Sequence, residues 1–309
     1  MKIRIGTRGS ALALWQAEWV REHLQNAHPQ LECELVIIKV RGDQVLDRPL
    51  ALVGGKGLFV KEIEEALLAG EVDVAVHSLK DLPVEQPEGL TLAAYPPRAS
   101  AFDVLCPTRP GETLMTLPAG ARVGTTSLRR GAQVRRLRPD LEVISIRGNV
   151  QTRLDRRRGD DPLDAVILAE AGLRRLDVWE DSFEVLAPPA FIPAPAQGCM
   201  AVQTREADDV VSGLVRALDD PEARLAITAE RSCLAGIEGS CHTPFGAWAK
   251  RDDVDGLVLY ARLLQEDGTA TEAKRMVVLR EDPLAQAVDL GRIMARNLLE
   301  RASALLPRS

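Results

Sequence analysis

The feature that most constrains the fold of this chain is an order of strand, turn and helix that occurs twice. Residues 4–8 are Arg-Ile-Gly-Thr-Arg and residues 122–126 are Arg-Val-Gly-Thr-Thr, and each segment leads through a serine into a helical run. Strands that alternate with helices indicate a parallel α/β sheet. Two further pairs of segments match in the same order: 40–43 with 146–149, and 73–76 with 164–167. The repeat predicts two similar α/β lobes; chance similarity of short strand–helix units is the alternative.

The first lobe contains a continuous apolar run over residues 35–40, which is typical of a strand covered on both faces. A second buried strand is predicted over 72–76, and helices over 11–24 and 58–69. Ser10 is the predicted N-cap of the helix over 11–24. A helix over 128–137 follows the first strand of the second lobe.

The pattern changes after residue 210. Two helices lead to alternating strands over 257–263 and 273–279 and to an amphipathic helix over 284–304, which predicts a small α+β domain. Proline-rich residues 188–198 connect the lobes. We therefore expect an α/β protein with three domains: residues 1–98 with 199–217, residues 103–193, and residues 220–309.

Composition excludes several classes of protein. No apolar run approaches the ~20 residues that cross a membrane, and Met1 leads straight into a strand, so we expect neither a membrane span nor a signal peptide. The five cysteines are scattered and odd in number, which argues against a disulfide framework and favours a reducing cytoplasm. Cys233, Cys241 and His242 lack a second ligand pair at zinc-like spacing, so we expect no metal.

Charge is distributed unevenly along the chain. The net charge is −6, yet residues 121–175 hold thirteen arginines, no lysine and seven acidic residues, a local charge of +6. Guanidinium groups match carboxylates and phosphates with two hydrogen bonds at once, so this region predicts recognition of specific anionic groups. General attraction to nucleic acid would mix Lys and Arg over a wider face. Within the region we expect residues 156–158, three consecutive arginines, to be a solvated helix face.

A loop over residues 238–244 is the first candidate site. It follows a helical run over 222–234, and Gly239 and Pro244 interrupt any regular structure. Cys241 lies there beside small residues, and a reachable thiolate is a nucleophile. The alternative is a free cysteine with no role, or one that packs as a small hydrophobe.

The second candidate site is the pair Lys80 and Asp81, at the carboxyl end of the strand over 72–76. A carboxylate in an enclosed cationic cleft can accept protons, donate them and stabilise a cation. A surface ion pair before a turn is the alternative.

The third candidate site is the start of the helix over 128–137. Thr126 or Ser127 is a predicted N-cap, and Arg129 and Arg130 lie in the first turn, where cations oppose the helix dipole. This unfavourable interaction with the helix dipole suggests another role, in which the backbone amides and the two guanidiniums together hold an anion. The alternative is that the two arginines are an exposed basic pair. Because α/β sheets bind ligands beyond the carboxyl ends of their strands, two facing lobes would enclose a cleft with these lining residues: Arg8, Arg41, Lys56, Lys80, Asp81, Arg129, Arg130 and Arg147.

Several segments in a fixed order carry a family resemblance: residues 5–14, 53–61, 77–83, 124–130, 147–150, 193–198 and 239–241. Together they resemble the porphobilinogen deaminases, also called hydroxymethylbilane synthases, over nearly the whole chain. The resemblance implies two lobes like those of periplasmic binding proteins, and a third domain whose cysteine is joined by a thioether to a dipyrromethane cofactor. It implies head-to-tail condensation of four porphobilinogen molecules with release of four ammonia molecules, after which water frees hydroxymethylbilane.

The resemblance also implies roles for single residues. Cys241 matches the cofactor-attachment cysteine, Asp81 the catalytic aspartate, and Lys80 a cofactor-contacting lysine. Other matches to cofactor-binding groups are Ser127, Arg129, Arg130 and Arg147. Matches to substrate-binding groups are Arg8, Ser10, Lys56, Arg153, Arg175 and Gln197.

The sequence departs from the family pattern at three positions. Leu52 stands where a relative has a second cleft lysine, and Ser240 replaces a glycine that is frequent before the cysteine. Cys199 is a second thiol that could react off target.

Two other functions are open on the residues alone. One is a non-catalytic, two-lobed anion-binding protein, and the other is a nucleic-acid binder that uses the arginine-rich lobe. Both leave Cys241 and the third domain unexplained. We therefore expect a cytoplasmic, monomeric enzyme whose partner is porphobilinogen, with no nucleic-acid or membrane partner.

Overall fold

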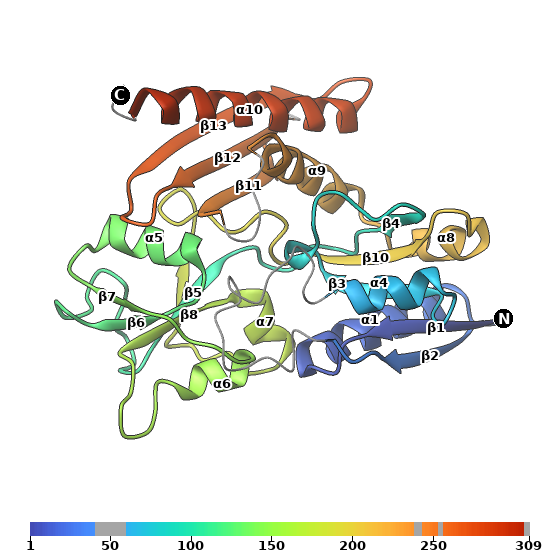
Figure 1. The fold of residues 1–309 in the computed structure, drawn as a ribbon, viewed down its shortest axis with the longest axis horizontal. Coiled ribbons are helices and arrows are strands. Elements are labelled where there is room, and N and C mark those ends of the chain that lie inside the picture. The colour runs from blue at the N-terminus through green and yellow to red at the C-terminus, as the bar shows by residue number, and fades with distance from the viewer. Residues whose placement is uncertain (41–59, 238–242, 253–255, 306–309) are drawn as a thin grey trace. The chain divides into compact units, whose positions relative to one another are not determined.

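The computed structural model describes residues 1–40, 60–237, 243–252 and 256–305 (Figure 1). The chain forms two compact units. The first unit comprises residues 1–99 and 198–224, and the second comprises residues 100–197 and 225–309. The chain therefore crosses between the units three times.

A five-stranded sheet in the order β2-β1-β3-β10-β4 forms the centre of the first unit. β1 is parallel to β2 and β3, whereas β10 is antiparallel to both β3 and β4. The strands are β1 (Lys2–Thr7), β2 (Glu32–Ile37), β3 (Val74–Ser78), β4 (Leu90–Ala94) and β10 (Met200–Arg205). The helices are α1 (Ala11–Ala27), α4 (Lys61–Leu68), η1 (Leu79–Asp81), α8 (Asp209–Val215) and η2 (Arg216–Leu218).

A second five-stranded sheet, in the order β7-β6-β8-β5-β9, lies in the second unit. β6 is parallel to β7 and β8, and β5 is antiparallel to β8 and β9. The strands are β5 (Asp103–Pro107), β6 (Arg122–Gly124), β7 (Glu142–Ile144), β8 (Ala165–Ala169) and β9 (Glu184–Leu186). Its helices are α5 (Leu128–Leu137), α6 (Val150–Asp155) and α7 (Glu170–Arg175).

The two sheets share one arrangement, which confirms the predicted pair of α/β lobes. In each, a parallel trio (β2-β1-β3 or β7-β6-β8) is followed by an antiparallel strand and then an edge strand. The fourth strand of the first sheet, β10, comes from the part of the chain that returns from the second unit. The parallel pairing that the strand–helix alternation predicts is found in the trio of each lobe. The antiparallel strands lie outside that pattern, because the alternation does not include a strand such as β10 that returns from another part of the chain.

One predicted strand was misplaced. β2 covers Glu32–Ile37 rather than 35–40, and each of its residues is exposed or only partly buried. It is the edge strand of its sheet, so it is not covered on both faces as predicted. The apolar run continues past the strand because Ile38 and Val40 pack in a small core with Ile63 and Leu67 of α4.

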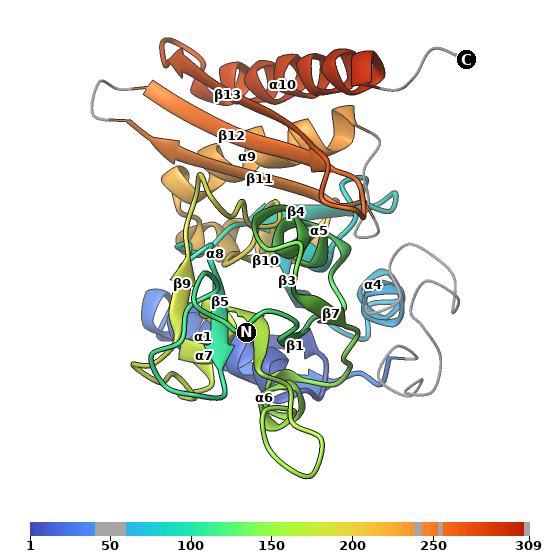
Figure 2. The ribbon, with the colours of Figure 1, turned by 90° about the vertical axis from the view of Figure 1, so that its left-hand side faces the viewer.

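The third sheet belongs to the second unit and consists of three antiparallel strands in the order β11-β12-β13. Two helices cover one of its faces, where alternate residues of β11 and β12 meet them in a core (Figures 1 and 2). The elements are α9 (Pro221–Gly236), β11 (Phe245–Arg251), β12 (Gly256–Leu264), β13 (Ala270–Val278) and α10 (Pro283–Leu305). The predicted α+β composition of this region is confirmed, and the boundaries of three domains stay a prediction.

Helices α9 and α10 cross at very short range where α10 carries a glycine. A Cβ atom at Gly291 would lie 2.5 Å from the carbonyl oxygen of Ala229 and 2.7 Å from the amide nitrogen of Cys233. Both of these are backbone atoms, so the helices would have to move apart to admit any side chain. The close crossing therefore depends on the absence of a side chain at Gly291.

We expect Gly291→Ala to lower the free energy of unfolding by about 1–3 kcal/mol, the cost of overpacking a core. The matched control is Gly213→Ala on α8, where an added Cβ would meet nothing within 4 Å. That change should raise stability by about 0.5–1 kcal/mol, because alanine favours the helix. Urea unfolding of both variants checks the pair. An equal change in the free energy of unfolding for the two variants would contradict the close packing of α9 against α10 at Gly291.

Candidate functional site

Asp81 lies in a short turn directly after β3, and its side chain is exposed. The backbone of this turn is anchored, because the Leu79 amide donates to the Cys199 carbonyl at 3.1 Å and the Leu82 amide donates to the Leu79 carbonyl at 3.2 Å. The Leu79 side chain is buried, which also holds the turn against the body of the first unit. The carboxylate therefore projects from a well-held segment of backbone.

Residues of β1 and α1 lie at the same edge of the first sheet. β1 and β3 are parallel neighbours, so Arg8, which follows β1, and Asp81, which follows β3, lie beyond the same ends of the strands. Ser10 is the N-cap of α1, as predicted, and its hydroxyl accepts a hydrogen bond from the Ala13 amide at 3.4 Å. Gln16 of α1 donates to the hydroxyl of Ser78 at 3.0 Å. The first lobe thus gathers Arg8, Ser10, Lys80 and Asp81 at one edge.

Behind this edge is a buried network around His77. Its Nε2 lies 3.1 Å from Oε1 of Gln203, whose amide nitrogen donates to Glu64 and to Gln86. Since the Gln203 oxygen can only accept, His77 carries its proton on Nε2. Burial, with a smaller contribution from the charge of Arg8, lowers the pKa of His77 to about 4, although the hydrogen bond to Gln203 acts in the opposite direction. His77 is therefore neutral at physiological pH.

The second lobe repeats the arrangement at the ends of its parallel trio. Of the two predicted candidates, Thr126 and Ser127, it is Ser127 that is the N-cap of α5, and its hydroxyl accepts a hydrogen bond from the Arg130 amide at 3.4 Å. Arg147 follows β7, the parallel neighbour of β6, and its Nη2 is buried without a hydrogen-bond partner among the described residues. Arg153 of α6 donates from Nε to the Gly148 carbonyl at 2.8 Å, and Arg175 is the last residue of α7. Ser127 and Arg147 thus lie beyond the same strand ends, with Arg153 close behind.

The first turn of α5 does hold an anion, and that anion is a carboxylate of the protein. Asp103, the first residue of β5, is 0% exposed, and Arg129 and Arg130 are only 5% and 6% exposed. Arg129 binds both Asp103 oxygens, at 2.6 and 3.2 Å. Arg130 binds Oδ1 of Asp103 from Nε at 2.8 Å and from Nη2 at 2.7 Å. The two guanidiniums are therefore neither solvated nor an exposed pair.

Gln197 completes this buried cluster. Its amide nitrogen donates to Oδ1 of Asp103 at 3.0 Å and to the Ala101 carbonyl at 2.7 Å. Despite the cost of desolvation, the two guanidiniums hold the pKa of Asp103 well below its usual range. Sequence reasoning missed Asp103, although a carboxylate in the apolar run over residues 101–106 is a signal, because a buried charge needs a cation.

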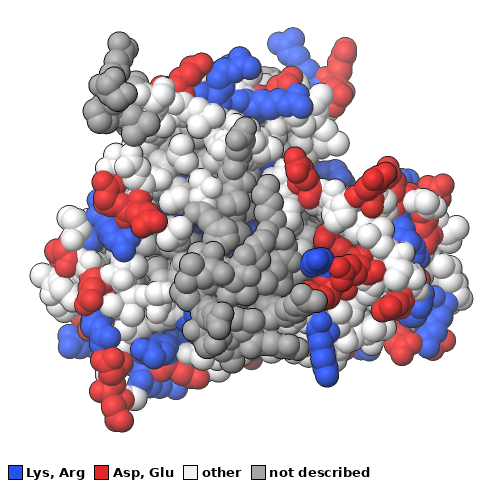
Figure 3. Space-filling view, viewed as in Figure 1, with Lys and Arg blue, Asp and Glu red and all other residues white. Residues whose placement is uncertain are grey.

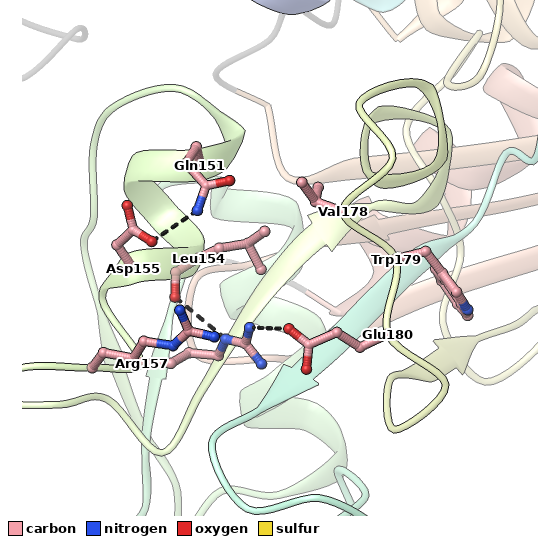
Figure 4. A pocket seen from close by; sticks show the side chains of 8 residues that line it. Gln151, Leu154, Asp155, Arg157, Val178, Trp179 and Glu180 are labelled. Carbon is pink, nitrogen blue, oxygen red and sulfur yellow. Dashed lines mark hydrogen bonds and ion pairs between the residues drawn. The ribbon is translucent and has the colours of Figure 1, made fainter.

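Part of the arginine-rich region is buried. Arg157, which we predicted to be solvated, is 7% exposed and donates to the Pro107 carbonyl and to Glu180. It helps to line a cavity of about 230 Å³ on the second lobe that includes none of the predicted site residues (Figure 4). On the face in Figure 3, basic and acidic side chains are interspersed. This arrangement does not resemble a nucleic-acid surface.

Some predicted residues are not placed by the structure. Lys56, Arg41 and Cys241 lie outside the described residues. Cys199 is 2% exposed, so its thiol is not the reachable off-target group that the sequence suggested. Among the residues that the structure describes, no three His, Cys, Asp or Glu side chains are grouped as metal ligands. None of the described helices is long and apolar enough to cross a membrane.

Comparison with known proteins matches almost the whole chain to one family. Residues 3–213 match the model "Porphobilinogen deaminase, dipyromethane cofactor binding domain", and residues 224–300 match "Porphobilinogen deaminase, C-terminal domain". A porphobilinogen deaminase of Roseiflexus castenholzii is 48% identical over 304 residues, which cover 98% of each chain. One of Syntrophotalea carbinolica is 44% identical over 301 residues, which cover 97% of this chain and 93% of the relative. Among solved structures, the methionine binding protein MetQ matches with a TM-score of 0.43 and 15% identity, over 72% of this chain and 91% of that one.

The two α/β lobes and the matched cofactor-binding domain define an α/β enzyme that carries its own organic cofactor. The chain belongs to the porphobilinogen deaminase family. The family resemblance that the sequence motifs indicated is thereby confirmed.

The neutral, buried His77 predicts a specific pH dependence. The pKa of His77 in the folded protein is about 4, against about 6.5 when unfolded. The unfolded chain therefore binds this proton first as the pH falls from 6.5 to 4, and stability falls by roughly 3 kcal/mol across that window. In His77→Gln this part of the pH dependence should disappear, and urea unfolding at several pH values measures it.

Glu64 titrates in the opposite sense. Burial raises the pKa of Glu64, so protonation of this group favours the folded state as the pH falls. The difference between the wild type and His77→Gln removes this shared contribution. Equal slopes for the two proteins between pH 6.5 and 4 would show that His77 is not held neutral.

Proposed function

We propose that the chain condenses four porphobilinogen molecules head to tail into hydroxymethylbilane, with release of four ammonia molecules. This reaction belongs to tetrapyrrole biosynthesis. The observation that carries the function is the match to both domains of the porphobilinogen deaminases over residues 3–213 and 224–300. A non-catalytic anion-binding protein is not favoured, because the relatives that match almost the whole chain bear the name of the enzyme.

The residues of the second lobe fit a dipyrromethane cofactor. Each of its rings carries acetate and propionate, and Arg147 offers a buried Nη2 that lacks an acceptor among the described residues. An unsatisfied guanidinium N–H in a partly dry site matches a carboxylate oxygen. We propose that Arg147, Ser127, Arg129, Arg130 and Lys80 hold the cofactor, and that Cys241 binds it covalently. When bound, the cofactor supplies the primer on which the product is built.

Asp81 is the proposed catalytic residue. Loss of ammonia breaks a carbon–nitrogen bond, the electron pair leaves with nitrogen, and the pyrrole ring becomes cationic. A carboxylate beside that ring stabilises the cation and can accept the proton released when two rings couple. The support for this role is the exposed Asp81 side chain on an anchored turn at the ligand-binding edge of the sheet.

Cationic and hydroxyl groups at the strand ends are proposed to bind the substrate. The product gains two carboxylates with every ring, so charge in the site must be balanced at each addition. The residues proposed for this task are Arg8, Ser10, Lys56, Arg153, Arg175 and Gln197. Arg8 and Ser10 support the assignment, because they lie at the same edge of the sheet as Asp81.

The cellular location and assembly are further proposals. We propose that the protein acts as a monomer in the cytoplasm. Four of its five cysteines lie among the described residues, and all four are free thiols. Free thiols are typical of a reducing compartment, which supports this location.

Asp81→Asn removes the negative charge at nearly constant shape, so it should lower turnover by about 10²–10⁴-fold, the range for general acid–base catalysis. The steady-state rate is measured on protein whose cofactor content is known from intact mass. Glu88→Gln is the matched control, because Glu88 is an exposed carboxylate of the same unit. Near-normal turnover of loaded Asp81→Asn would rule out the role.

Cys241→Ser should remove the covalent adduct, because an alkoxide forms far less readily than a thiolate. The intact mass of the purified chain should then equal that of the polypeptide. Cys33→Ser is the control, since Cys33 is a partly exposed thiol in the first unit, and it should keep the adduct. An adduct that persists in Cys241→Ser would place the attachment elsewhere.

A further inference from the structure

The Asp103 cluster (Asp103, Arg129, Arg130 and Gln197) lies at two of the three points where the chain crosses between its units. The crossings fall between residues 99 and 100, between 197 and 198, and between 224 and 225. Within the second unit, Gln197 ties the first two crossing segments together through Ala101 and Asp103. Within the first unit, the Ala99 amide donates to the Gly198 carbonyl at 3.2 Å. The segment around residues 99–103 and the segment around residues 197–198 are therefore hydrogen-bonded to each other within each of the two units.

The cluster has more positive than negative charge. Asp103 is the sole carboxylate in ion-pair contact with Arg129 or Arg130 among the residues described, so two guanidiniums face one carboxylate and the formal charge is +1. Their other hydrogen bonds go to neutral groups. Arg129 donates to the Ile192 carbonyl at 2.8 Å, and Arg130 donates to the Ile167 carbonyl at 3.0 Å and to Oε1 of Gln197 at 3.5 Å. A buried excess charge is costly unless an anion completes it. The cluster is thus prepared for an anionic group of a ligand.

Asp103 also determines how the guanidiniums are directed. Two nitrogens of each arginine contact it: Arg129 through two hydrogen bonds, and Arg130 through one hydrogen bond and one ion pair. Gln197 donates one further hydrogen bond. Bidentate bonds fix the plane of a guanidinium as well as its position. With both planes fixed by one carboxylate, each arginine has a single arrangement in which its other N–H groups can meet a ligand.

We infer that Asp103 is a positioning residue for the condensation: its buried carboxylate holds Arg129, Arg130 and Gln197 in the one arrangement that receives carboxylates both of the cofactor and of the incoming porphobilinogen. This inference rests on the proposed function. Asp103 itself does not touch the ligand, because its side chain is 0% exposed and its oxygens are taken up by protein donors.

The test is Asp103→Asn in the full chain. The amide nitrogen of asparagine cannot accept, so at least one guanidinium loses its bonds and the formal charge of the cluster rises to +2. The KM for porphobilinogen should rise about tenfold or more, which corresponds to the loss of one charge-assisted contact, while kcat changes less. Rates are divided by the fraction of chain that carries the covalent adduct, measured by intact mass. The thermal midpoint is recorded on the same samples.

Asp73→Asn is the matched control. Asp73 precedes β3, at the end of the strand opposite to Asp81, and it too pairs with two arginines. It accepts from Arg4 at 2.8 and 3.0 Å and from Arg205 at 3.2 Å. Its loss should lower the thermal midpoint and leave KM within about twofold, because neither arginine belongs to the proposed site. A purely structural role for Asp103 would give the same result in both variants.

Each outcome decides the inference. An unchanged KM in Asp103→Asn, with an active wild type, overturns the positioning role and leaves the proposed function intact. An inactive wild type would instead overturn the proposed function. If Asp103→Asn does not fold, the double variant Asp103→Asn with Arg129→Met restores a formal charge of +1. The comparison for the double variant is Arg129→Met alone, which loses the same guanidinium. A folded double variant whose KM exceeds that of Arg129→Met supports the inference. A KM equal to that of Arg129→Met, or failure of both Asp103 variants to fold, assigns Asp103 to stability alone.

Discussion

The second unit depends on one buried carboxylate. Asp103 lies at the start of β5, and its oxygens join the first turn of α5 to the segment that ends at Gln197. Burying two arginines without a counter-charge would cost several kcal/mol each. The carboxylate removes much of that cost. It also allows two cations to stand in the first turn of a helix, where the dipole alone would disfavour them.

A second constraint is the direction of the parallel strands. In each lobe a trio of parallel strands brings its carboxyl ends to one edge, and loops that leave that edge carry polar side chains. The first lobe places Arg8 and Asp81 there, and the second places Ser127 and Arg147 there. The shared topology therefore explains why residues far apart in sequence serve comparable positions in the two lobes.

Helix α5 joins the second lobe to the C-terminal sheet within one unit. Gln133 of this helix accepts from the Ile192 amide and from Arg262 of β12, which also donates to the Pro189 and Ala190 carbonyls. The N-terminus of α5 carries the Asp103 cluster, and Cys241 lies four residues before β11 of the attached sheet. Helix α5 thus links the arginines proposed to bind the cofactor to the sheet that follows Cys241 in the sequence.

The sequence by itself determined the features that depend on neighbours along the chain. Ser10 and Ser127 were predictable as N-caps because a cap needs only the next turn of its own helix. The repeated strand–helix order predicted both lobes, and ordered motifs predicted the family. The tertiary structure alone decided the partners of Arg129, the burial of Arg157 and the edge position of β2. Each of these depends on which distant segment packs nearby, and local pattern does not contain that information, because burial and pairing arise only when the strands assemble.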